Sequence, residues 1–155
     1  FKVTSIVAND EQARAALWHK RSMLSESCQN FLGYKISEDV AVPLSKQQEF
    51  SLAAKALAKK NLTCAFFGHA ADGNLHVQIM FSDKKYLKDA EELRHQILLL
   101  VLKLKGTLTA EHGIGLKKKS YLHLEQSQSL INLQKRIKKA FDPENLLNPG
   151  KIFDL

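Results

Sequence analysis

Four stretches of the chain carry apolar residues at the spacing of an amphipathic helix. The first three begin at residues that can cap a helix, Asp10, Ser45 and Asp83, and Gly33 ends the first. The predicted helices cover roughly residues 10–33, 45–57, 83–104 and 126–141. The positions expected to face inward are Ala13, Leu17, Leu24, Cys28 and Phe31, then Phe50, Ala53, Ala54 and Leu57, then Leu87, Ala90, Leu93, Ile97, Val101 and Leu104, and finally Leu130, Leu133, Ile137 and Phe141.

Shorter runs rich in β-branched and aromatic residues separate these helices and predict strands. The runs are Phe1–Val7, Asp39–Val42, Asn61–His69, Asn74–Phe81 and Thr107–Thr109. Between the third and fourth runs, the pair Asp72-Gly73 is typical of a type I′ hairpin turn, because both residues tolerate a positive φ. The alternation of elements, broken by this hairpin, predicts an α+β fold with helices packed on one face of an antiparallel sheet. After the last helix, the tail Asn148–Leu155 is expected to be extended.

The chain has 155 residues, 45% of them hydrophobic and 25% charged, which is typical of one globular domain. Its longest apolar run, Ile97–Leu102, has six residues, whereas a membrane-spanning helix needs about 20. Two cysteines, Cys28 and Cys64, are too few for a disulfide framework and are expected to be reduced thiols. The first residue is Phe1 rather than Met, so we expect the natural chain to start earlier.

The densest polar segment is Gly68–His76, which spans the predicted hairpin. If Asp72 and Gly73 form the turn, His69 lies directly opposite His76, with Cβ atoms about 4.5–5.5 Å apart. Two imidazoles placed in this way can bind one divalent metal ion such as zinc. The alternative is a purely structural pair of histidines across the hairpin.

A second polar segment, Thr107–Gly115, places Glu111 and His112 at the start of a Gly-x-Gly turn. Glu111 could add an oxygen ligand to the two histidines, and a three-ligand site with an open position is typical of catalytic metals. His112 would then be a free base beside the metal, with an ordinary pKa of about 6.5. The alternative for this segment is a capped loop without chemistry.

Three motifs in order, Gly68–His76, Gly106–Gly115 and Phe141–Lys151, resemble the C-terminal domain of FAD-linked oxidases. Leu17–Arg21 and Ser37–Pro43 agree with the same pattern, so the resemblance covers nearly the whole chain. It is strongest to the group of glycolate oxidase GlcD, D-lactate dehydrogenase and D-2-hydroxyglutarate dehydrogenase. The chain departs from the family at Lys105, where a glycine is frequent, and at Leu44, where an arginine is common.

The resemblance implies a ferredoxin-like α+β fold and the oxidation of a D-2-hydroxy acid with hydride transfer to FAD. The flavin would be held mainly by a separate N-terminal domain that this chain lacks, so the chain alone is expected to be inactive or nearly so. The resemblance further implies a cytoplasmic protein, which could lie at a membrane surface, and an electron-transfer partner.

The resemblance also assigns roles to particular residues. The implied metal ligands, with zinc the expected ion, are His69, His76 and Glu111. His112 would be the general base on the substrate hydroxyl, and Arg21 would bind the substrate carboxylate. The residues expected to line the substrate pocket are Asn74 and Gln78, and those expected near the flavin are Asn148 and Lys151.

Two other functions remain open on the sequence. A standalone metal-dependent hydrolase could use the same ligands, with a metal-bound water and His112 as base. The net charge of +7 also suits a basic binding module for nucleic acid or for an acidic surface. Against nucleic acid, the run Lys117–Lys119 has only Tyr121 nearby as an aromatic residue and is expected to be a solvated face. The remaining histidines, expected at the surface or on helix faces, are His19, His95 and His123.

Overall fold

The structure is a computed structural model that describes residues 6–155. The helices are α1 (Glu11–Ser22), α2 (Leu24–Leu32), α3 (Gln47–Leu57), α4 (Leu87–Lys103), α5 (Leu122–Glu125) and α6 (Gln128–Phe141). The strands are β1 (Tyr34–Ala41), β2 (Thr63–His69) and β3 (Asn74–Phe81). The strand predicted over residues 1–7 falls mostly outside the described residues, and Ile6 and Val7 have no regular structure.

The three strands form one antiparallel sheet in the order β1-β3-β2, which confirms the α+β class. The strand predicted at Thr107–Thr109 is reduced to a single bridge between Thr107 and Ala41, on the outer side of β1. With that bridge in the place of a fourth strand, the chain order β1-α3-β2-β3-α4-bridge is that of a ferredoxin-like fold.

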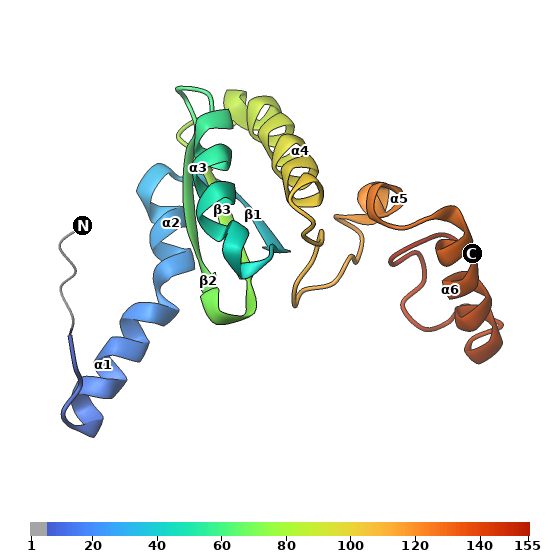
Figure 1. Cartoon of the computed structure of the whole chain (residues 1–155), viewed down its shortest axis with the longest axis horizontal. Helices are drawn as coiled ribbons and strands as arrows, with labels where there is room; N and C mark the ends of the chain where they lie inside the picture. Colours follow the sequence, from blue (N-terminus) through green and yellow to red (C-terminus); the bar gives the residue numbers. More distant parts are fainter. Residues whose placement is uncertain (1–5) are drawn as a thin grey trace.

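The two faces of the sheet differ because side chains alternate along each strand. On β3, the residues of one face are buried in the hydrophobic core under α3 and α4: Leu75, Val77, Ile79 and Phe81. The other face is polar and carries Asn74, His76 and Gln78. Helix α2 contacts β1 and β3 and lies on the side of the sheet away from α4 (Figure 1), so part of the polar face is covered as well.

The first predicted helix is broken into α1 and α2 at Met23, which caps both. Ser22 donates its hydroxyl to the carbonyl of His19, a local bond that competes with helix geometry. Gly33 ends α2 as predicted, with a φ of 86° that favours glycine. None of the predicted inward positions of α1 and α2 is fully buried, and α1 projects away from the sheet (Figure 1).

The turn between β2 and β3 is not the predicted two-residue type I′ turn. Ala70–Asp72 form a single 3-10 turn, and Gly73 follows with a left-handed φ of 77°. Tertiary contacts hold this longer turn, because Gln47 donates to the carbonyl of Ala70 and a Cβ on Gly73 would overlap the carbonyl oxygen of Val42. The register therefore shifts, and His69 pairs with Asn74 rather than with His76.

Helix α6 exposes the face that the pattern predicts to be buried. The apolar residues on the exposed side, which we call the α6 apolar face, are Leu130, Leu133, Ile137 and Phe141. Ile131 lies on the other side and is 7% exposed. The tail is not extended, because it turns at Asn148 and Ile152, which both have positive φ. It comes back to α6, where the Lys135 ammonium lies 5.9 Å from the centre of the Phe153 ring.

On α4 the predicted core residues Ala90, Leu93, Ile97, Val101 and Leu104 are buried, whereas Leu87 is exposed. Both cysteines are free thiols, as expected. No helix among the described residues combines the length and apolar character needed to cross a membrane.

Candidate metal and substrate site

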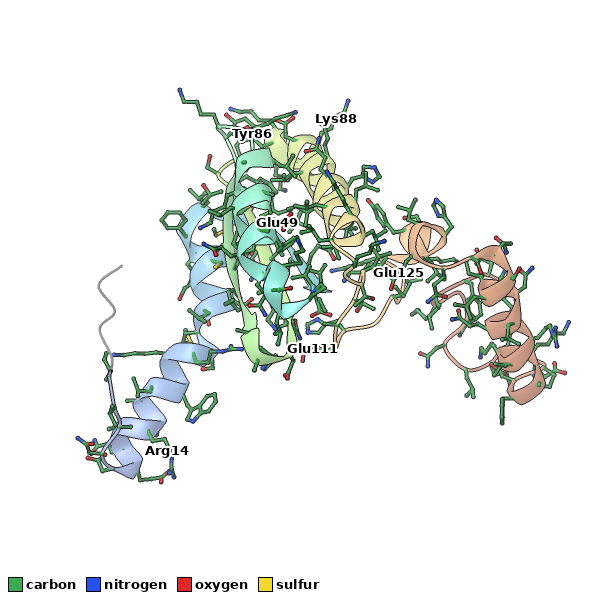
Figure 2. The ribbon with its side chains drawn as sticks, viewed as in Figure 1. Arg14, Glu49, Tyr86, Lys88, Glu111 and Glu125 are labelled. Carbon is green, nitrogen blue, oxygen red and sulfur yellow. The ribbon has the colours of Figure 1, made fainter. Side chains whose placement is uncertain are left out.

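The sheet and the loop after α4 bring four predicted residues together. His76 is the third residue of β3, His69 ends β2, and Glu111 and His112 lie in the loop between α4 and Lys119. Figure 2 shows Glu111 next to the turn that joins β2 and β3. His76 Nε2 is 3.1 Å from Glu111 Oε1, and His69 Nε2 is 3.8 Å from Glu111 Oε2. His112 Nε2 is 3.4 Å from Glu111 Oε1. The two segments that the sequence singled out therefore meet at one place.

His69 and His76 share a face of the sheet but are diagonal neighbours, because the register places Phe67 directly opposite His76. Their ring centres are 6.0 Å apart. The predicted direct opposition is wrong, yet the predicted proximity holds, since positions two apart on a strand point to the same side.

The environment of His76 favours its neutral form. Its side chain is 14% exposed, and burial lowers the pKa of His76 below its usual value, against the opposing pull of the Asp39 and Glu111 carboxylates. A neutral imidazole has a free lone pair, which is the form that ligates metal ions. His76 is thus ready to act as a ligand at neutral pH.

These donors suit a divalent metal ion of the kind that imidazole and carboxylate bind. The predicted set of His69, His76 and Glu111 supplies two nitrogens and one oxygen. A second set is also close, because Asp39, His76, Glu111 and His112 offer ligand atoms that all lie within 4.8 Å of one another. His76 and Glu111 belong to both sets and are the centre of the site.

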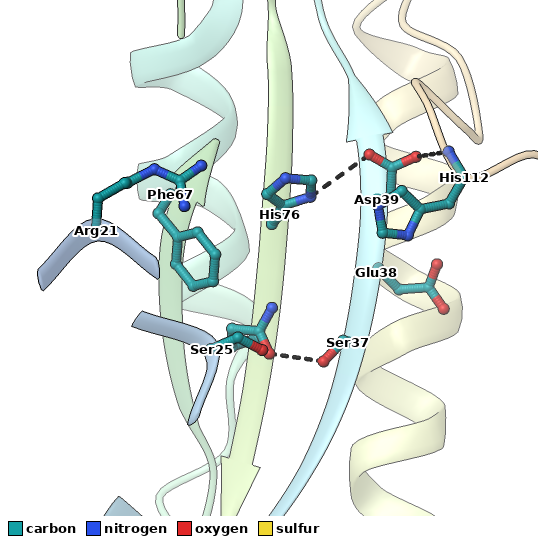
Figure 3. A pocket seen from close by; sticks show the side chains of 9 residues that line it. Arg21, Ser25, Ser37, Glu38, Asp39, Phe67, His76 and His112 are labelled. Carbon is teal, nitrogen blue, oxygen red and sulfur yellow. Dashed lines mark hydrogen bonds and ion pairs between the residues drawn. The ribbon is translucent and has the colours of Figure 1, made fainter. Parts of the chain in front are cut away.

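A groove beside the cluster has a volume of about 230 Å³ and is lined on one side by Arg21 of α1 (Figure 3). The Arg21 guanidinium lies 5.9 Å from the centre of the Phe67 ring. Gln78 lines the same groove and accepts a hydrogen bond of 2.6 Å from the Ser37 hydroxyl. His76 lines it as well, so a small anion could contact both a cation and the metal cluster.

Asn74 lies in a neighbouring groove with His69 and Glu111. Its side chain is buried, and its Oδ1 has no hydrogen-bond partner among the described residues. Asn148 and Lys151 do not join the site, because both are exposed in the tail after α6 and line none of the grooves next to the cluster. Their expected place near the flavin stays a prediction, and no step below is derived from those two side chains.

Several residues of the site went unassigned in the sequence. Phe67 and Ser25 line the groove, and Glu125 of α5 accepts the backbone N–H of Leu108 and the Thr107 hydroxyl at the base of the loop. Asp39 lies between His76 and the loop (Figure 3). The sequence signal for Asp39 is an alternation. Ser37, Asp39 and Ala41 fall on one side of an extended chain, and the apolar Val40 and Val42 fall on the other.

The lysine run is not the solvated face that the sequence predicts. Lys118 is buried and donates to the carbonyl oxygens of Asp39 and Leu108. Lys119 contacts Asp154 and the carbonyl of Gly150. Only Lys117 is fully exposed, so the run offers little positive surface to a nucleic acid. His19 and His123 are exposed as expected, and His95 lies beside the Tyr121 ring.

The chain is thus a ferredoxin-like α+β domain that gathers histidines and carboxylates at its polar sheet face and the adjoining loop. Residues 2–152 match the family described as "FAD linked oxidases, C-terminal domain", and the chain belongs to that family.

Three similar proteins illustrate the family. The chain is 37% identical over 150 residues to "D-lactate dehydrogenase [cytochrome], mitochondrial" of Arabidopsis thaliana, which covers 94% of the chain and 26% of the relative. It is 35% identical over 156 residues to a D-2-hydroxyglutarate dehydrogenase of Xanthomonas citri pv. viticola, covering 96% and 33%. It is 36% identical over 147 residues to glycolate oxidase subunit GlcD of Bacillus subtilis, covering 93% and 31%. The chain thus spans about a third or less of the length of these relatives.

Proposed function

We propose that this chain is the substrate-binding part of an FAD-dependent oxidoreductase that converts a D-2-hydroxy acid to the 2-oxo acid. The observation that carries the proposal is the shared groove, which has Arg21 on one wall and His76 and His112 on another, with Glu111 3.1 Å behind His76. The names of the relatives, which include D-lactate and D-2-hydroxyglutarate dehydrogenases, support the same substrate class.

The chemistry divides among the residues of the groove. Arg21 binds the substrate carboxylate with its planar fork. His69, His76 and Glu111 would hold a divalent metal, and that ion would supply Lewis-acid polarisation of the substrate hydroxyl. Zinc is the ion that we expect. His112, more exposed than His76, takes the hydroxyl proton as general base. Bound FAD would supply the two-electron acceptor, so that loss of the hydroxyl proton to His112 and of the C2 hydrogen as hydride would leave the 2-oxo acid.

The test is flavin reduction in the longest natural protein that contains these residues. Purified with FAD, it should lose the visible absorbance of oxidised flavin when D-lactate, glycolate or D-2-hydroxyglutarate is added, and not with L-lactate or L-2-hydroxyglutarate. We expect His112→Gln to slow this reduction by about 10²–10⁴-fold, the usual contribution of general base catalysis, without loss of bound FAD.

Lys60→Gln, an exposed change at a residue that lines none of the grooves next to the cluster, is the matched control and should leave the rate unchanged. Full flavin reduction in His112→Gln would contradict the assigned base. Ester hydrolysis that depends on His112, in a protein that fails to reduce flavin with any of these acids, would favour the hydrolase alternative instead.

We also propose that the flavin-binding part of the same protein covers the α6 apolar face. That face is the largest apolar surface left open on α6, and Phe141 is 86% exposed. The relatives are about three times as long as the chain, and the family is by name a C-terminal domain, so a further part of the protein is available to cover it. Cytoplasmic localisation and an electron-transfer partner remain predictions that accompany this function.

A further inference from the structure

The side chain of Asp39 is buried, with 4% of its surface exposed, although it carries a carboxylate. It lies on β1 directly opposite His76 on β3. Burying a carboxylate is costly unless hydrogen bonds or opposite charges compensate it. The groups that compensate the Asp39 charge therefore indicate what the residue does.

One carboxylate oxygen of Asp39 is bound to the loop that carries Glu111 and His112. Oδ2 accepts the backbone N–H groups of Ala110, Glu111 and His112 at 2.9–3.0 Å and the Thr109 hydroxyl at 3.3 Å. Burial alone would raise the pKa of Asp39, but these N–H groups outweigh it and the pKa lies below its usual value. Successive N–H groups on one anion fix the backbone around it, so Asp39 sets the direction in which both side chains point.

The other oxygen of Asp39 faces His76. Oδ1 is buried without a hydrogen-bond partner among the described residues, and it lies 3.6 Å from His76 Nδ1 (Figure 3). The opposite ring nitrogen, Nε2, faces Glu111. A carboxylate next to Nδ1 favours the tautomer with the proton on Nδ1, which leaves the lone pair of Nε2 free for a metal.

A buried lysine, Lys118, also joins β1 to the loop that carries Glu111 and His112. Lys118 donates to the carbonyl oxygens of Asp39 and Leu108, and its Nζ is 3.1 Å from Glu38 Oε2. Strand and loop are therefore joined through the backbone of Asp39 as well as through its carboxylate. This double attachment means that Asp39 holds a fixed position relative to both the histidine and the loop.

We propose that Asp39 is the positioning residue of the site. It orients the Glu111–His112 loop through Oδ2 and holds His76 in the Nδ1–H tautomer through Oδ1. The inference rests on the proposed function for the role of the metal, but the geometry of Asp39 is independent of it. Although Asp39 belongs to the close cluster of possible ligands, its Oδ2 is already saturated, and its Oδ1 lies at the nitrogen of His76 that points away from Glu111.

The first test is a titration of the 155-residue chain with Co²⁺ alone. Calorimetry measures the affinity, and the visible spectrum of the bound ion reports its ligands. We expect Asp39→Asn to weaken Co²⁺ binding by about 10–100-fold, as loss of a partner behind a metal ligand does, with the ligand-field spectrum kept. Asp142→Asn is the matched control, because Asp142 is also buried and accepts two backbone N–H groups, but on α6. It should bind Co²⁺ like the wild type.

The second test needs no metal. In ¹⁵N NMR spectra at neutral pH, we expect His76 in the Nδ1–H tautomer in the wild type and in Asp142→Asn. In Asp39→Asn the amide NH₂ can donate to Nδ1, so the proton should move to Nε2. Hydrogen exchange at the amides of residues 110–112 should become faster in Asp39→Asn alone.

The outcomes distinguish failure of the metal assignment from failure of the positioning role of Asp39. If Co²⁺ binding is the same in the wild type and in His76→Ala, the metal assignment fails, while the NMR and exchange results still decide the role of Asp39. An Nε2–H tautomer in the wild type, with unchanged exchange at residues 110–112 in Asp39→Asn, would overturn the positioning role. A Co²⁺ spectrum that changes in Asp39→Asn as it does in His76→Ala would overturn it too, because Asp39 would then be a ligand.

Discussion

At the scale of single residues, three charged side chains that are largely shielded from solvent lie on the core side of the site: Glu38, Arg94 and Lys118. Glu38 points to the core side of β1, where it contacts the Arg94 guanidinium and the Lys118 ammonium. Loss of Lys118 would leave the buried Glu38 carboxylate with Arg94 as its cationic partner, and breaking up buried charges in this way costs far more than the contact itself contributes. Lys118 also supplies hydrogen bonds to two carbonyl oxygens, so its loss would leave several groups unpaired.

We therefore expect Lys118→Met to lower the free energy of unfolding by about 3 kcal/mol, although the change is to an apolar residue of similar length. Lys117→Met, next in the chain but exposed, should change it by less than about 0.5 kcal/mol. Urea unfolding of the three proteins measures both values. Equal stability of the two variants would show that the Lys118 contacts do not contribute to folding.

The contrast between these residues shows what could be predicted at this scale. His69, His76, Glu111 and His112 were identified because residue types with metal and acid-base chemistry are grouped in two short motifs. Lys118 was predicted to be solvated, because a lysine between two lysines has the pattern of a surface. Its burial, like that of Asp39, depends on which carbonyls the fold places around it, and no local pattern carries that information.

At the scale of elements, the end of α4 holds a residue that does not suit its conformation. The N–H of Gly106 binds the carbonyl of Val101 and the N–H of Lys105 binds that of Leu102, the two bonds of a Schellman motif. Lys105 occupies the left-handed position of this motif with a φ of 63°. A residue with a Cβ is strained there, whereas glycine is not.

We expect Lys105→Gly to raise the free energy of unfolding by about 0.5–1 kcal/mol, since relief of strain exceeds the entropy that glycine adds to the unfolded chain. Lys105→Ala keeps the Cβ and should give no gain, which makes it the control. Gly106→Ala should be destabilising, because a Cβ there would overlap the carbonyl oxygen of Ala41. Thermal unfolding followed by circular dichroism measures all three, and a stabilised Lys105→Ala would contradict the explanation by strain.

The elements themselves were largely predictable, whereas their junctions were not. The periodic positions of α4 from Ala90 to Leu104 are buried as expected, because a strong helical period leaves one stable way to bury them. The turn before Gly73 escaped prediction because Gln47 and Val42, distant in sequence, hold it open. A two-residue turn is favoured by local chemistry alone, and tertiary contacts overrule it.

At the scale of the whole molecule, α1 and α6 extend on opposite sides of the sheet (Figure 1). Trp18 on α1 is exposed, as are the residues of the α6 apolar face. The helical period of α6 correctly indicated an apolar face, but the side of α6 that is buried is the one with Ile131. A pattern of apolar residues predicts that a face is buried. It does not indicate whether this chain or another part of the protein buries it.

The double variant Leu133→Gln/Ile137→Gln tests whether another part of the protein buries the α6 apolar face. In the isolated chain both side chains are already about half exposed, so its stability should fall by no more than about 1 kcal/mol per residue. In the longer protein with its flavin-binding part, the same double change should cost about 1.5–3 kcal/mol per residue, the value of burying a large apolar side chain. Ile131→Gln, on the buried side of the same helix, should destabilise both proteins. Thermal unfolding measures the four effects, and a double variant as stable as the wild type in the longer protein would show that the flavin-binding part does not cover this face.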